Sequence, residues 1–196
     1  MTDPHIDAIR PPLRAALFLD RDGTVITDEH YLNDAERVRL MPGAASSIAR
    51  ANLAGIPVVI ITNQSGIGRG MITQEQYNAV ADRLLALLAS DGALIDATYH
   101  CPDHPNVPAA ESCRKPNIRM YETAANDLGL DLARSAYVGD KWRDVQPALT
   151  TGGLGILVPN HDTEQLDIDR AVLTAHTAAD IEQAVTQALV WLGVVD

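Results

Sequence analysis

Short apolar segments that each stop at a polar or charged residue constrain the fold of this chain more than any other feature. A short apolar run that is bounded by turn residues is typical of a buried strand. The predicted strands are residues 15–19, 57–61, 95–99, 136–139 and 154–158. Between them lie longer segments with helix start and stop signals. This alternation predicts a parallel sheet covered by helices on both faces, a three-layer, Rossmann-like α/β fold.

Capping residues mark several of the predicted helices. The clearest helix begins after Thr73 and Gln76, which have the spacing of a capping box, and runs to about residue 90. Thr177 is expected to cap the last helix, which should end near Gly193. The other predicted helices are residues 44–54, residues 118–128 and a short segment after residue 140.

Length and composition predict one globular domain. The chain has 196 residues, of which 46% are hydrophobic, so it can bury a core without disulfides. We expect an N-terminal tail over residues 1–14, which is rich in proline, and a single domain over residues 15–196. Two cysteines are too few for a disulfide framework.

The charge balance limits the kinds of partner. A net charge of −11 argues against binding nucleic acid, because the phosphate backbone would be repelled. No segment has the apolar length of a signal peptide core or a membrane span, so we expect a cytoplasmic protein without a membrane partner. If the substrate is an anion, the site itself must supply local positive charge.

An acidic pair follows the first predicted strand. Asp20 stands where the strand ends, and Asp22 comes two residues later, before Gly23. A carboxylate in this place can attack phosphorus, and a second carboxyl can protonate the leaving oxygen and then deprotonate water. Because phosphate and carboxylate repel each other, such a site needs a divalent cation, and oxygen ligands suit Mg²⁺. Taken alone, the pair fits an ordinary turn equally well.

Two further polar residues stand where predicted strands stop. Thr62 follows the second strand, and Asp140 follows the fourth. In parallel sheets, ligands bind at the carboxyl ends of the strands. We therefore expect Asp20, Thr62 and Asp140 to lie on one rim of the sheet.

Four segments resemble, in order, the motifs of haloacid-dehalogenase (HAD) superfamily phosphatases. They are LFLDRDGT, ITNQSG, CRKP and YVGDKWRD, at residues 17–24, 61–66, 113–116 and 137–144. The resemblance implies a magnesium-dependent phosphomonoesterase with an aspartyl-phosphate intermediate. Asp20 would be the nucleophile and Asp22 the general acid and base. The implied magnesium ligands are Asp20, Asp22 and Asp140.

The same resemblance assigns roles to neighbouring residues. Thr62 and Lys115 would act on the transferring phosphoryl group. Asp144 would not bind the metal itself but would orient Lys141 or a metal-bound water. The implied substrate contacts are Asp28, Tyr31, Thr62, Asn63, Gln64, Ser65, Arg114 and Lys115.

Short sequence segments narrow the resemblance to one group of phosphatases. TNQSGIGRG, YHCPDHP and VGDKWRD look like the heptose 1,7-bisphosphate phosphatases, which are relatives of the histidinol-phosphate phosphatases. This resemblance implies removal of the 7-phosphate from D-glycero-D-manno-heptose 1,7-bisphosphate in nucleotide-heptose synthesis. The gaps between motifs do not readily hold a large cap domain. We expect a monomer or a small homo-oligomer.

The loop after the third predicted strand departs from the family pattern, which is Cys-x-His followed by Cys-x-Cys around a structural zinc. Cys101 and Cys113 match the first and last ligands. Asp103 stands in place of the His and Glu111 in place of the third ligand, although His104 is adjacent. We therefore expect prolines and local hydrogen bonds, rather than zinc, to hold this loop.

Several alternatives remain open. One alternative is a histidinol-phosphate or other small-metabolite phosphatase. A phosphorylated amino alcohol would favour acidic groups near its ammonium, whereas a bisphosphate needs a second basic cluster. Arg69 and Arg114 are candidates for that basic cluster. A phosphomutase would usually need a cap. A non-catalytic phosphate-binding protein would normally lack the nucleophile or the general acid, and both are present.

Overall fold

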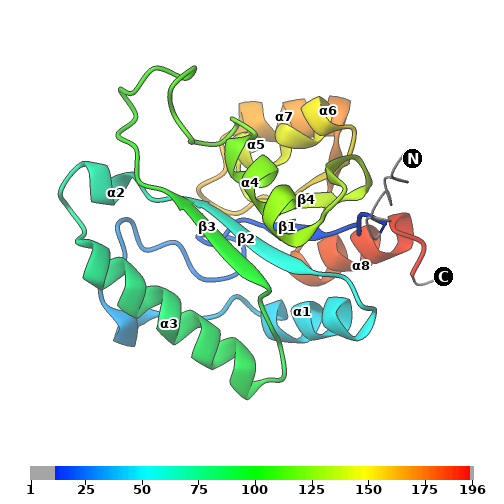
Figure 1. Cartoon of the computed structure of the whole chain (residues 1–196), viewed down its shortest axis with the longest axis horizontal. Coiled ribbons are helices and arrows are strands. Elements are labelled where there is room, and N and C mark those ends of the chain that lie inside the picture. Colours follow the sequence, from blue (N-terminus) through cyan, green and yellow to red (C-terminus); the bar gives the residue numbers. More distant parts are fainter. Residues whose placement is uncertain (1–11, 195–196) are drawn as a thin grey trace, which may run out of the picture.

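A computed structural model describes residues 12–194. Six parallel strands form one sheet in the order β3-β2-β1-β4-β5-β6, with β1 near its centre (Figure 1). The strands are β1 (Leu17–Leu19), β2 (Val58–Asn63), β3 (Ala97–Cys101), β4 (Ala136–Gly139), β5 (Leu154–Leu157) and β6 (His176–Thr177). In this register Leu17 pairs with Val58 on one side and with Ala136 on the other. The predicted parallel sheet is confirmed.

Helices cover both faces of the sheet (Figure 1). On one face lie α1 (Ala44–Leu53), α3 (Gln74–Ser90) and α8 (Ile181–Trp191). On the other lie α4 (Arg119–Leu128), α5 (Trp142–Val145), α6 (Pro147–Thr151) and α7 (Gln165–Thr174). The short α2 (Ser65–Gly68) and the 3₁₀ turns η1 (Ala35–Arg37) and η2 (Leu132–Arg134) complete the described elements.

The central strand shows why the apolar runs are continuous. Leu17 and Leu19 enter the core under α1, α3 and α8. Phe18 points to the opposite face, where its ring lies 5.1 Å from the rings of Tyr121 and Tyr137. Because successive side chains of a strand point to opposite faces, a strand that is covered on both sides needs apolar residues at every position.

The last helix begins later than expected. Thr177 does not cap it, because Thr177 belongs to β6 and pairs with Leu157 of β5. The cap is Asp180, whose side chain accepts a hydrogen bond of 2.8 Å from the backbone nitrogen of Gln183. The capping box of Thr73 and Gln76 is confirmed at the start of α3.

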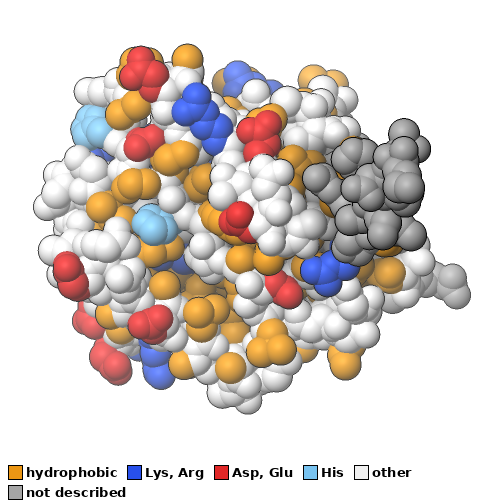
Figure 2. Space-filling model, in the orientation of Figure 1, with side chains coloured by type: hydrophobic (Ala, Val, Ile, Leu, Met, Phe, Trp, Pro, Cys, Tyr) orange, Lys and Arg blue, Asp and Glu red, His pale blue; other side chains and the backbone are white. Residues whose placement is uncertain are grey.

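Two further points concern the predicted boundaries. Arg14, which we assigned to the tail, is tied down by its backbone: its nitrogen donates to Gly129 and its carbonyl accepts from Asp131. Residues 1–11 of the predicted tail lie outside the described residues. No helix within residues 12–194 is both long and apolar enough to cross a membrane. Figure 2 shows acidic and basic side chains interspersed on the face it presents.

Candidate active site

The carboxyl ends of β1, β2 and β4 meet at one edge of the sheet, as predicted. Because β1 pairs with both neighbours, Asp20, Thr62 and Asp140 converge there. Each is buried, with an exposed fraction of 8%, 1% and 1% respectively. The backbone nitrogen of Asp20 donates to the carbonyl of Val138, which fixes the end of β1 against β4.

Lys115 is the buried cation of the site. Its ammonium lies 2.5 Å from Oδ1 of Asp20 and 2.7 Å from Oδ1 of Asp144, and it donates to the carbonyl of Ile61 at 2.6 Å. Asn63 holds its backbone: Oδ1 of Asn63 accepts from the Lys115 nitrogen, and Nδ2 donates to the Lys115 carbonyl. The amide of Asn63 therefore positions Lys115, a contact that the sequence did not suggest.

Negative charge exceeds positive charge on this floor. Burial raises the pKa of Asp20 to about 8. The positive charge of Lys115 opposes this rise, whereas the negative charges of Asp144 and Asp140 add to it. Burial likewise raises the pKa of Asp140. Burial alone would lower the pKa of Lys115, but Asp144 and Asp20 hold it above its usual value. Such a group of carboxylates favours an added cation.

The donor atoms fit a hard divalent metal. One carboxylate oxygen from each of Asp20, Asp140 and Asp144 lies within 4.8 Å of the others. Oxygen ligands of this kind suit Mg²⁺. Asp144 is already engaged, because it pairs with Lys115 and its Oδ2 accepts from the backbone nitrogen of Lys141. The donor set therefore supports Asp20 and Asp140 as the carboxylate ligands.

The Asp22 carboxylate, which lines the same cavity as Asp20, is held by a network of side chains. Nη2 of Arg21 lies 2.9 Å from its carboxylate, and Nε2 of Gln64 donates to Oδ2 at 2.8 Å. The hydroxyl of Thr62 lies 3.5 Å from the same oxygen. Arg21 is itself buried and lies over the ring of Tyr77. This network fixes the direction of a carboxyl beside Asp20.

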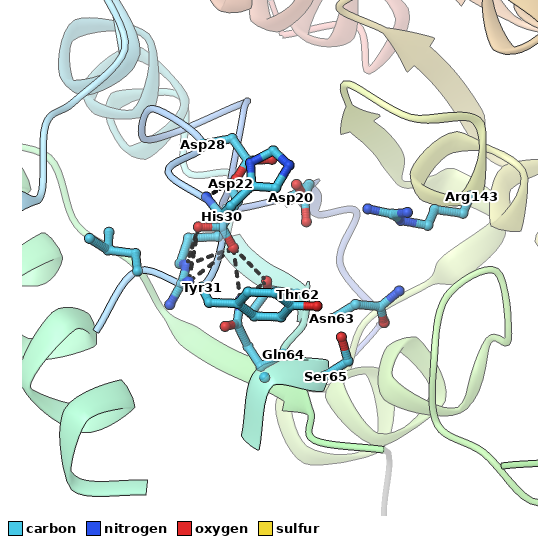
Figure 3. Close-up of a pocket in the computed structure, with 13 residues that line it drawn as sticks. Asp20, Asp22, Asp28, His30, Tyr31, Thr62, Asn63, Gln64, Ser65 and Arg143 are labelled. Carbon is cyan, nitrogen blue, oxygen red and sulfur yellow. Dashed lines mark hydrogen bonds and ion pairs between the residues drawn. The ribbon is translucent and has the colours of Figure 1, made fainter. Parts of the chain in front are cut away.

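A cavity of about 210 Å³ opens above Asp20. Arg143 points toward Asp20 from one side, and His30 and Tyr31 lie on the other (Figure 3). The lining residues are Asp20, Arg21, Asp22, Asp28, His30, Tyr31, Leu32, Thr62, Asn63, Gln64, Ser65, Gly66 and Arg143. Of the expected substrate contacts, Arg114 and Lys115 are absent from this lining.

The loop after β1 forms one wall of the cavity in an unusual conformation. His30 and Tyr31 have φ angles of 37° and 60°, in the left-handed region that disfavours residues with a side chain. The Tyr31 ring packs against Gly66, where an added Cβ would lie 2.7 Å from the ring. Gly66 therefore leaves room for Tyr31 at the edge of the cavity.

Comparison with known proteins identifies the family. Residues 112–184 match the HAD-hydrolase-like family model. The chain is 41% identical to the D-glycero-D-manno-heptose-1,7-bisphosphate 7-phosphatase of Chlorobaculum tepidum, over 87% of this chain and 92% of that one. It is 43% identical to the D-glycero-β-D-manno-heptose-1,7-bisphosphate 7-phosphatase of Mesorhizobium japonicum, over 72% of this chain and 68% of that one. The chain belongs to the heptose-1,7-bisphosphate 7-phosphatase family. The family that the sequence motifs indicated is thereby confirmed.

A solved structure of the same family agrees with the fold. The D,D-heptose 1,7-bisphosphate phosphatase of B. bronchiseptica, complexed with magnesium and phosphate, superposes with a TM-score of 0.79 at 32% identity, covering 89% of this chain and 98% of that one. A HAD-like phosphatase from Mesorhizobium loti gives a TM-score of 0.78 at 36% identity, covering 95% and 90%.

The loop after β3 differs from what we expected for this family member. Cys101 and Cys113 form a disulfide, which the cysteine count did not predict. Oδ2 of Asp103 accepts from the hydroxyl of Ser112 and from the backbone nitrogen of Cys113. His104, the candidate substitute ligand, instead accepts from Asn106 through Nδ1. Local hydrogen bonds do hold the loop, and the disulfide adds a covalent link.

Three arginines are candidates for attracting an anion at this site, namely Arg69, Arg114 and Arg143. Arg114 donates to the carbonyl of Asp103 at 3.3 Å, outside the cavity lining. Partial burial lowers its pKa, and the positive charges of Arg143 and Arg69 lower it further. The sequence did not single out Arg143. It follows Asp140 by three residues in the fourth motif, which was the available signal.

Proposed function

We propose that this protein is a Mg²⁺-dependent phosphomonoesterase that removes the 7-phosphate of D-glycero-D-manno-heptose 1,7-bisphosphate. One observation carries the proposal: Asp20 lines the cavity with one oxygen on Lys115, and no hydrogen bond from residues 12–194 reaches its other oxygen. A buried carboxylate with one free oxygen and a neighbouring cation suits nucleophilic attack on phosphorus. The family relatives named above support the substrate.

In this mechanism Asp20 attacks phosphorus with the oxygen that Lys115 does not contact. The bond from phosphorus to the sugar oxygen breaks as Asp22 donates a proton to that oxygen. Asp22 then takes a proton from water, whose oxygen attacks the aspartyl phosphate and releases inorganic phosphate and Asp20. Lys115 stays paired with Asp20 and offsets negative charge in both steps.

The general acid and base needs a fixed direction for these proton transfers. Arg21 and Gln64 both bond to the Asp22 carboxylate. Because Arg21 is buried, its charge is poorly screened by solvent. We infer that Arg21 and Gln64 hold Asp22 ready beside the leaving oxygen.

Carboxylate oxygens of Asp20 and Asp140, together with the main-chain carbonyl of Asp22, would hold Mg²⁺. When bound, Mg²⁺ supplies the positive charge that lets a phosphoryl group approach these acidic side chains. The magnesium and phosphate bound to the B. bronchiseptica relative support this assignment.

The second phosphate of the substrate needs its own positive charge. Arg143 lines the cavity, and the positive charges of Arg143 and Arg69 both lower the pKa of Arg114. We infer that these arginines attract the 1-phosphate, with Asp28, Tyr31, Asn63, Gln64 and Ser65 as the expected contacts along the sugar. Bidentate guanidinium contacts suit a phosphate better than a lysine would.

Histidinol phosphate is the second candidate substrate. Asp28 lines the mouth of the cavity, and a carboxylate there would attract an ammonium. Arg143 lines the same cavity and disfavours a cationic group, so we place this candidate second. A cytoplasmic location and a monomeric or small homo-oligomeric state, both expected from the sequence, stay predictions.

The test is phosphate release with Mg²⁺ from both anomers of heptose 1,7-bisphosphate, histidinol phosphate and common sugar monophosphates. We expect kcat/KM to be highest for one heptose bisphosphate anomer. Asp20→Asn protein from the same purification controls for contaminating phosphatase. Faster release from histidinol phosphate would favour the second candidate, and no release from any substrate above the Asp20→Asn background would refute the proposal.

A further inference from the structure

Asp140 is held by a segment that none of the four motifs contains, the loop after β5 (residues 158–164). It contacts both Asp140 at the end of β4 and Gly23 in the turn after β1. Nδ2 of Asn160 donates to Oδ2 of Asp140 at 2.9 Å and lies 3.3 Å from the carbonyl of Gly23. One amide group thus links the ends of two strands that supply the proposed metal ligands.

The orientation of this amide follows from its other bonds. Oδ1 of Asn160 accepts from the backbone nitrogen of Asp162 at 2.8 Å. Because a backbone nitrogen can only donate, the oxygen end of the amide must face Asp162 and the NH₂ end must face Asp140. Thr163 strengthens the arrangement, since its hydroxyl accepts from the Asn160 nitrogen and donates to the Asp140 carbonyl.

The contacts of the Asp140 side chain involve only one of its two carboxylate oxygens. Oδ2 accepts from Asn160 and lies 3.2 Å from the ammonium of Lys141. Among residues 12–194, no hydrogen bond reaches Oδ1. A carboxylate whose one oxygen is bound by donors can present its second oxygen to a cation in a fixed direction.

Gly23 makes this contact sterically feasible. A Cβ at that position would lie 2.6 Å from Oδ2 of Asp140 and 2.9 Å from Nδ2 of Asn160, both too close. Its φ of +82° also favours glycine. Gly23 therefore allows the Asn160 amide and the Asp140 carboxylate to pack directly over the turn that carries Asp22.

We propose that Asn160 is a positioning residue for the metal: it orients the Asp140 carboxylate and ties it to the turn after β1, so that the proposed ligands keep a fixed separation. This inference rests on the proposed magnesium dependence. Neighbours of this kind, which hold a ligand rather than the metal, typically change metal affinity by about 10–100-fold when they are removed.

The experiment compares wild type with Asn160→Ala by two measurements. The first is the Mg²⁺ concentration that gives half-maximal activity, with kcat recorded at saturating Mg²⁺. The second needs no turnover: the rise of Tm with Mg²⁺ concentration in the absence of substrate. We expect the half-saturating Mg²⁺ concentration for activity to rise about 10-fold or more, with kcat at saturating Mg²⁺ recovering to within a few-fold of wild type. We also expect the variant to need about 10-fold or more Mg²⁺ for the same rise in Tm.

Asn52→Ala is the matched control. Asn52 also bridges two backbone groups through its amide, the nitrogen and carbonyl of Leu94, but it lies at the opposite end of the strands. It should lower Tm without moving the Mg²⁺ midpoint. If Asn160→Ala fails to fold, Asn160→Ser, which removes the amide but keeps a polar group, takes its place.

The outcomes separate this inference from the function itself. An unchanged Mg²⁺ midpoint in a folded Asn160 variant of a magnesium-dependent enzyme overturns the positioning role only. A shift in both Asn160→Ala and Asn52→Ala also overturns it, because general destabilisation would then explain the change. Wild-type activity that needs no divalent metal overturns the proposed magnesium dependence as well.

Discussion

The floor of the site and the loop over residues 102–114 lie at the same edge of the sheet, but different forces hold them. The floor residues are buried, and the Lys115 ammonium pairs with two of their carboxylates; they are Asp20, Thr62, Lys115, Asp140 and Asp144. The loop is largely exposed and is fixed by Asp103 and a disulfide. A floor set by strand ends tolerates little change, whereas a surface loop can exchange one means of support for another.

We expect the floor to carry out phosphoryl transfer and the loop to take part in substrate recognition. The floor, together with Asp22 beside it, has every residue that the family resemblance implied for phosphoryl transfer. The loop, which presents Arg114, lacks two of the implied zinc ligands. If the comparison is right, floor variants will reduce kcat for every substrate, and variants of the loop and rim will act on KM, substrate choice or stability.

Asp20→Asn should have the largest effect. An amide is a poor nucleophile, so we expect kcat to fall by roughly 10⁴-fold or more for every substrate. Steady-state phosphate release measures this, with Asp169→Asn, an exposed position on α7, as the control. Near-normal turnover in Asp20→Asn would remove the floor from the mechanism.

Arg143→Ala tests recognition at the rim. Loss of a charged hydrogen-bonding group should lower kcat/KM for the bisphosphate by about 10–100-fold, and less for a monophosphate of the same sugar. Arg134→Ala, exposed at the far end of β4, is the control. An equal loss for both substrates would mean that Arg143 acts on the transferred phosphate and belongs with the floor.

Replacing both Cys101 and Cys113 by Ser tests what holds the loop. Opening this link should lower the free energy of unfolding by about 2–4 kcal/mol and raise KM more than it lowers kcat. Denaturant unfolding measures stability, and intact mass with metal analysis distinguishes a disulfide from zinc in the wild type. Stoichiometric zinc with two free thiols would contradict both the disulfide and our expectation of a zinc-free loop.

The smallest effect should come from His100, which stacks on Tyr77 beneath the loop with ring centroids 4.2 Å apart. Burial lowers the pKa of His100, and the charge of Arg21 adds to this. Below a pH of about 6.5 the unfolded chain then binds more protons than the native state, so stability falls as pH falls.

His100→Gln should therefore flatten the decline of Tm between about pH 7 and pH 5.5. The exposed His176→Gln is the control, and it should leave that decline as it is in wild type. A steeper decline in His100→Gln would show that His100 gains, rather than loses, affinity for protons on folding.

The sequence by itself determined the sheet and the residues at its rim. Apolar runs that are covered on both faces must be continuous, and polar residues that follow such runs must emerge at one edge. That is why Asp20, Thr62 and Asp140 could be placed together from the chain alone. The two-residue β6 is too short to show a periodic pattern, and α7 was not predicted either.

Only the tertiary structure decided how those rim residues are supported. Asn63 holds Lys115 across 52 positions, and Asn160 holds Asp140 from a loop 20 positions away. Such contacts depend on where loops cross in space, and a lone Asn carries no local signal of its partner. The Cys101–Cys113 link was missed for the same reason, since pairing depends on the distance between side chains and not on their number.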